Sequence, residues 1–236
     1  ERFRIAPGAA TVTGTLTATT ADNLDTLSLI STDADANVAP NLRMYRNSGS
    51  AADADQLGKI QFEGKNDAGS PEDVIYGEIG SQIKDASDGT EDGRIFINSI
   101  VGGTTVSRID MTEGETVFNN DTVDLDFRVE SDDNANMLFV DGGDDAVVIG
   151  HNASYLSNGN RSAFQVQGTT HGDTGTLQAR WSDDALGPIF TTGKSRSASI
   201  GTFTIVQDDD FVGRWLGVAA DGVDFVSQVA AISMQI

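Results

Sequence analysis

Apolar residues in this chain occur in short runs separated by turn formers. The clearest case is residues 125–150, where the apolar runs occupy residues 127–129, 137–140 and 146–149. The turns between them are built from Asp, Asn, Ser and Gly. Short runs of Val, Phe and Ile bounded by such residues are typical of β-strands joined by tight turns. We therefore expect three short strands here, too few to bury much apolar surface alone.

Period-two alternation of apolar and polar residues continues on both sides of that stretch. It predicts extended chain or a strand over residues 12–16. It predicts strands over residues 42–45, 57–62, 74–83, 94–97 and 106–111. The Gly102-Gly103 pair predicts a hairpin, and two glycines within residues 74–83 argue against a helix there. Regularly spaced strands with turn chemistry between them predict an all-β sandwich.

The second half of the chain repeats the pattern of the first half. Residues 177–184 are similar to 27–33, residues 188–190 to 40–42, and residues 210–217 to 55–62. We interpret this as a diverged internal repeat of roughly 75 to 90 residues. The second copy stops before its closing strands, so we expect the chain to be a segment of a longer polypeptide.

The predicted fold class is all-β, with two repeated β-sandwich-like modules joined by extended or β-helical shaft-like segments. The expected divisions are a shaft-like segment (1–23), a first module (24–118), a shaft-like linker with a hairpin (119–162) and a second, truncated module (163–236). Each strand contributes few apolar side chains, so one copy has little core and exposed sheet edges. Three copies wound around an axis would pool these positions.

The amino-acid composition of the chain limits which binding partners it can have. The 236 residues carry a net charge of −21, which argues against nucleic acid and anionic membrane surfaces. No apolar run reaches the ~18 residues that membrane insertion requires. There is no cysteine, so no disulfide framework is expected. Strong acidity favours a solvated surface that resists lateral clumping.

With these features in view, the chain resembles tail-fibre and fibre-like structural proteins of tailed phages, particularly marine ones. The resemblance rests on the segments Glu1–Ile5, Met44–Ser48, Asp55–Phe62, Asp92–Phe96, Phe127–Asp132 and Met137–Asp141. It implies a homotrimeric fibre in the virion that contacts other virion proteins and a glycan or protein of the host cell surface. The chain lacks the Gly-X-Tyr-X-type repeats and the terminal chaperone-like region of some such fibres.

Two other functions are compatible with the same patterns. One is a bacterial surface adhesin or filament subunit, extracellular and stabilised by Ca²⁺. The other is a polysaccharide-degrading tailspike, because a glycosidase carboxylate pair is defined only by tertiary structure. The sequence contains no Ser-His-Asp arrangement, phosphate loop or GxGxxG motif, so we expect no enzymatic activity.

Two acidic turns have oxygen ligands at spacings suited to calcium. Calcium is the only cofactor for which the sequence offers candidate ligands. The first contains Asp33, Asp35 and Asn37, and the second contains Asp85, Asp88 and Asp92. The first resembles the start of an EF-hand loop but lacks the following Gly and the Glu at the twelfth position. Solvated turn carboxylates are the alternative interpretation.

Aromatic side chains are the candidates for glycan stacking. Trp181, beside two aspartates, and Tyr45 are the expected ligand-binding residues. Trp215 alternates with apolar positions and is expected in a core. His151 and His171 are expected to be solvated loop residues, because neither has a carboxylate partner at fixed spacing.

Overall fold

The computed structural model describes residues 11–236, and within that range the regular secondary structure is entirely β-strand. Strands β1 to β13 form several separate open sheets, and none closes into a barrel. The all-β prediction is confirmed. The segment Glu1–Ile5 and the first ten residues of the expected shaft-like segment lie outside the described residues.

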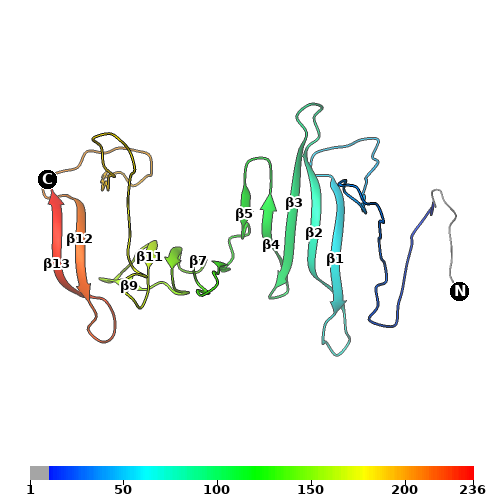
Figure 1. The fold of residues 1–236 in the computed structure, drawn as a ribbon, viewed down its shortest axis with the longest axis horizontal. Coiled ribbons are helices and arrows are strands. Elements are labelled where there is room, and N and C mark those ends of the chain that lie inside the picture. The colour runs from blue at the N-terminus through cyan, green and yellow to red at the C-terminus, as the bar shows by residue number, and fades with distance from the viewer. Residues whose placement is uncertain (1–10) are drawn as a thin grey trace.

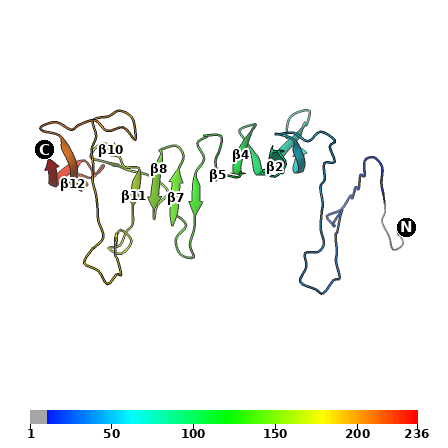
Figure 2. The ribbon, with the colours of Figure 1, turned by 90° about the horizontal axis from the view of Figure 1, so that it is seen from above.

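The sheets follow one another along an elongated molecule (Figure 1; Figure 2). The largest is a five-stranded antiparallel meander in which neighbours in sequence are neighbours in space. Its strands are β1 (Gln56–Lys65), β2 (Asp73–Asp85), β3 (Asp92–Val101), β4 (Thr104–Met111) and β5 (Thr116–Phe118). Gly102 and Gly103 both have positive φ and connect β3 to β4, as the sequence predicts for a two-residue hairpin.

The second sheet has four strands in the order β11-β8-β7-β6. Strands β6 (Phe127–Val129), β7 (Leu138–Asp141) and β8 (Ala146–Ile149) confirm the three predicted strands, and β11 (Phe164–Val166) adds a parallel edge beside β8. Phe139, Ala146 and Val148 form a small buried cluster within it. A short hairpin, β9 (Leu156–Ser157) and β10 (Asn160–Arg161), lies between β8 and β11 in sequence.

The last sheet is a hairpin of β12 (Phe211–Ala219) and β13 (Ser227–Gln235). Residues 11–55 and 167–210 contain no strand, so the strand predicted over residues 42–45 is wrong. A strand requires a hydrogen-bonded neighbour, and the described chain supplies none for these segments. Their apolar side chains, such as Leu27 and Leu42, are consequently exposed.

Residues 11–236 do not form the predicted sandwich arrangement. Within residues 11–236 the sheets are open single layers strung side by side, and the close contacts between strands lie mainly within each sheet. The chain exposes 18886 Å². A compact monomer of 24.8 kDa would expose only about 10,000 Å². A single copy therefore leaves several thousand Å² of surface uncovered that a globular protein of its size would bury.

Candidate interaction surface

The five-stranded sheet carries a continuous line of apolar side chains across one face. In the strand register Ile60 pairs with Ile79, Ile79 with Ile97, Ile97 with Ile109, and Ile109 with Phe118. We call these five residues the apolar row. Ile60, Ile79 and Phe118 are 43%, 40% and 49% exposed. Phe127 of β6 packs against the outer end of the row, with its ring centroid 4.9 Å from that of Phe118, but no second sheet of the described chain covers Ile60 and Ile79.

The apolar row extends along the strands as well as across them. Phe62 and Ile95 lie two positions from Ile60 and Ile97, which places them on the same face, and both are exposed. An exposed apolar face of this extent on a soluble protein marks an interaction site. The sheet is thus amphipathic, with one face available for a partner.

The opposite face of the sheet is polar, and Glu78 is one of its two centres. Lys59 Nζ donates to Glu78 Oε2 at 3.1 Å, and Asn98 Nδ2 donates to Oε1 at 2.9 Å. Burial alone would raise the pKa of Glu78. Hydrogen bonds from Lys59, Asn98 and Gln61 outweigh the burial and lower the pKa overall. Glu78 is therefore held as a carboxylate within this face.

Asp110 is the second centre of the polar face. Arg94 Nε donates to Asp110 Oδ1 at 2.6 Å, and Arg94 Nη2 donates to Oδ2 at 2.8 Å. Asn120 Nδ2 adds a third bond at 2.8 Å. These bonds, chiefly those from Arg94, lower the pKa of Asp110. Because Asp110 is buried, its charge is satisfied within the sheet rather than by solvent.

The β12–β13 hairpin also exposes apolar side chains. Trp215 pairs with Ile232, and these residues are 55% and 64% exposed. Phe190 packs against Trp215 with ring centroids 6.0 Å apart. The expectation that Trp215 lies in a core is therefore wrong for a single copy. Residues before β12 do not enclose the indole, and the hairpin has no second layer.

Two basic side chains bind the carboxylate of Asp210 and hold the loop before β12 in place. Arg196 Nε donates to Asp210 Oδ2 at 2.7 Å, and Lys194 Nζ donates to Oδ1 at 2.9 Å. The Gln207 backbone N–H donates to Oδ2 at 2.9 Å. The Arg196 hydrogen bond, followed by those of Gln207 and Lys194, holds the pKa of Asp210 well below its usual range. The carboxylate thereby closes residues 194–210 into a loop.

The predicted calcium ligands lie in two separate turns. Asp35 Oδ1 accepts from the Asn37 backbone N–H at 2.8 Å, and Asp33 accepts from the Asp35 N–H at 3.3 Å. Asp85 faces Asp92 across β2 and β3, whereas Asp88 lies in the turn between them. Over residues 11–236 no three His, Asp or Glu side chains come together as a metal site. Calcium at these positions remains a prediction.

The predicted glycan-stacking residues are both on the surface, but not beside one another. Trp181 is 88% exposed and lies in a strandless segment. Tyr45 is 65% exposed, and the Arg43 guanidinium lies 4.5 Å from the centre of its ring. They belong to different halves of the molecule, so they do not form a shared platform. Glycan binding at either residue remains a prediction.

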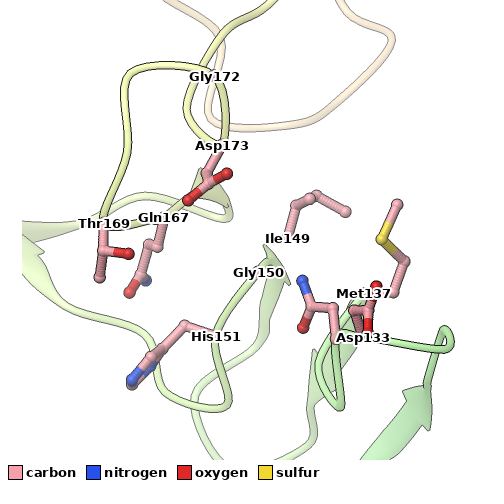
Figure 3. Close-up of a pocket in the computed structure, with 11 residues that line it drawn as sticks. Asp133, Met137, Ile149, Gly150, His151, Gln167, Thr169, Gly172 and Asp173 are labelled. Carbon is pink, nitrogen blue, oxygen red and sulfur yellow. The ribbon is translucent and has the colours of Figure 1, made fainter.

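A cavity of about 700 Å³ lies beside the four-stranded sheet, where the loop after β11 folds back (Figure 3). It is lined by Asp133, Asn134, Met137, Ile149, Gly150, His151, Gln167, Gly168, Thr169, Gly172 and Asp173. Thr170 hydrogen bonds lower the pKa of Asp173. His151 Nδ1 accepts from the Ala153 N–H at 3.1 Å, and its ring packs on Tyr155. The cavity has room for water or a small polar molecule.

Comparison with known proteins finds no family, no curated protein and no solved structure that matches this chain. No helix among residues 11–236 has the length and apolar character needed to cross a bilayer. The functional argument therefore depends on the surface geometry above.

The apolar row was not identified from the sequence. Its isoleucines were each assigned to predicted strands, but the register that aligns them is a property of the sheet. The available signal was the repeated placement of Ile at the middle of successive strands, at residues 60, 79, 97 and 109.

Proposed function

We propose that this chain is a structural fibre protein of a tailed-phage virion, a homotrimer that carries its β modules toward the host surface for adhesion and has no catalytic role. The observation that carries the proposal is the exposed apolar row on a sheet whose other face is polar. Its remaining partners would be other virion proteins and a glycan or protein on the host cell.

Three features support this function. The sheets succeed one another along an elongated chain, which suits an appendage that extends from the virion to the host surface (Figure 1). The exposed surface far exceeds that of a compact monomer, so association would supply the missing core. The acidic charge would remain on the outside of such an assembly and keep long particles apart.

The test is the mass of the purified chain in solution. Sedimentation velocity and native mass spectrometry at neutral pH should both give three times 24.8 kDa, and the trimer should persist in mild SDS. A chain that stays monomeric at micromolar concentration would rule out the proposal. Addition of EDTA separates it from a calcium-dependent adhesin, and release of reducing sugar from host capsule would indicate a tailspike instead.

A further inference from the structure

The β1–β2 and β12–β13 hairpins have the same irregularities at corresponding positions. In β1–β2 the register shifts between Gln56 and Gly58 and again between Phe62 and Glu63. In β12–β13 it shifts between residues 211 and 213 and again between 217 and 218. Every one of these first-strand positions is separated from its counterpart by 155 residues, as Gly58 is from Gly213. Bulges are specific local features, so two at the same spacing indicate the same backbone structure.

The entry into each hairpin is also the same. Ala54 and Asp209 both have positive φ, at 66° and 68°, although neither is glycine. The Ala54 N–H donates to Ile83 O at 2.9 Å, and the Asp209 N–H donates to Ile236 O at 2.9 Å. A left-handed residue outside glycine is uncommon, and here it occurs twice in one hydrogen-bonding arrangement.

The segments that precede the hairpins attach to them in matching ways. Arg46 Nη2 lies 2.9 Å from Asp55 Oδ1, and Lys194 Nζ lies 2.9 Å from Asp210 Oδ1. The side chain of Met44 lies against Gly58, and that of Thr192 lies against Gly213. Both glycines are positions where a neighbouring segment approaches too closely for a side chain without adjustment.

These correspondences place Trp215 and Ile232 where the first hairpin has Ile60 and Ile79. Each chain thus presents two equivalent apolar faces, one on the five-stranded sheet and one on the terminal hairpin. Apolar side chains are retained at both places, although the residues themselves differ. The two faces are therefore suited to the same kind of contact.

We propose that copies of this chain associate in parallel and in register, so that Ile79 meets Ile79 of the neighbouring copy and Ile232 meets Ile232. The inference rests on the proposed self-association and specifies its surface and direction. Both apolar faces are covered together, and the opposite face of the five-stranded sheet, which carries Glu78 and Asp110, lies outside the contact.

The different widths of the two sheets favour this direction. In an antiparallel arrangement the two-stranded hairpin would meet the five-stranded sheet, and Ile97, Ile109 and Phe118 would extend beyond it. Parallel, in-register copies match five strands with five and two with two. Once one face is joined, the second joins at the high effective concentration set by the shared chain.

The excess surface is large enough for such an assembly. A stable protein interface buries about 1,200–2,000 Å² in total, and obligate homo-oligomers bury more. The surface that this chain exposes beyond a compact monomer is several thousand Å², shared between the two apolar faces and the strandless segments. The apolar row contains no charged residue, so the net charge of −21 need not enter the contact.

Engineered cysteines test the register directly, because the natural chain has none. The variants are Ile79→Cys, Ile232→Cys and, as a matched control on the polar face of the same sheet, Gln61→Cys. Each variant is oxidised to form disulfides between copies. In a separate sample, the cysteines of neighbouring copies are joined by a short bis-maleimide. Cross-linked dimers are expected for Ile79→Cys and Ile232→Cys at yields at least tenfold above Gln61→Cys. Oxidative coupling requires Cβ atoms about 4 Å apart, and the maleimide extends that reach.

A mixture of separately tagged Ile79→Cys and Ile232→Cys chains, dissociated and reassociated together, tests the direction. In-register copies should give no link between positions 79 and 232. A dominant 79–232 link, or stronger linking by Gln61→Cys, would overturn the proposed register even if the protein is trimeric. A monomeric protein that links at no position would instead overturn the proposed function, so the two failures are distinguishable.

Discussion

The ring of Phe96 lies directly over the backbone of Gly80 on the neighbouring strand. A Cβ at Gly80 would stand 2.3 Å from Phe96 Cζ and less than 3 Å from both Cε atoms. Phe96 is one of the few buried apolar residues of the five-stranded sheet, and Gly80 provides the space for its ring. This contact lies on the polar face of the sheet, opposite the apolar row, and it holds β3 against β2.

Replacement of Gly80 by alanine should therefore destabilise the sheet. For Gly80→Ala we expect a loss of about 1–3 kcal/mol in the free energy of unfolding, the usual cost of overpacking. Urea denaturation followed by circular dichroism measures it. Gly93→Ala is the control, because Gly93 lies in β3 with open space around it. Equal losses in both variants would show that the Phe96 contact is not the cause.

The Arg94–Asp110 pair should contribute more than any exposed ion pair of the same sheet. Asp110→Asn leaves the Arg94 charge without its carboxylate. Loss of one partner of a buried pair costs several kcal/mol, and the partial exposure of Arg94 reduces this to about 2 kcal/mol. Asp73→Asn breaks the exposed Lys65–Asp73 pair and should cost less than about 1 kcal/mol. A similar cost for both would contradict the assigned role of Asp110.

Acid should unfold this sheet, and the sign follows from the lowered pKa values of Glu78 and Asp110. Below the ordinary carboxyl pKa the unfolded chain binds these protons before the folded chain does, so stability rises with pH. The contribution is fully present above about pH 4–5. It is lost as the pH falls through the lowered folded values. Urea midpoints measured from pH 7 downward should show this decline, with a shallower slope for Asp110→Asn.

Asp210 should control access to the loop before β12. In Asp210→Asn the charge that attracts Lys194 and Arg196 is removed, so residues 194–210 should open more often. We expect trypsin to cleave after Lys194 or Arg196 several-fold faster, as followed by mass spectrometry. Asp208→Asn removes the same charge two residues away and should leave the cleavage rate unchanged. Unchanged cleavage in Asp210→Asn would show that these ion pairs do not restrain the loop.

Local sequence pattern predicted the strands with internal partners well and failed where partners are missing. Residues 57–62 and 106–111 alternate, and they lie in β1 and β4. Residues 42–45 alternate in the same way and form no strand. The difference is the presence of a neighbouring strand within the described chain, which alternation alone does not encode.

The candidate sites show the same limit. Trp181 and Tyr45, the expected ligand-binding residues, are both exposed, and Trp215 was wrongly expected in a core. Side-chain type and periodicity identify a face that prefers to be covered, but they do not show whether the same chain covers it.

The sequence by itself determined that the protein is all-β, where its central turns lie, and that its surface is acidic, because residue type and spacing act locally. Only the tertiary structure decided that Ile60, Ile79, Ile97, Ile109 and Phe118 form one line on one face. Strand register is set by hydrogen bonds and bulges between distant segments, and a shift of one residue would send each side chain to the opposite face.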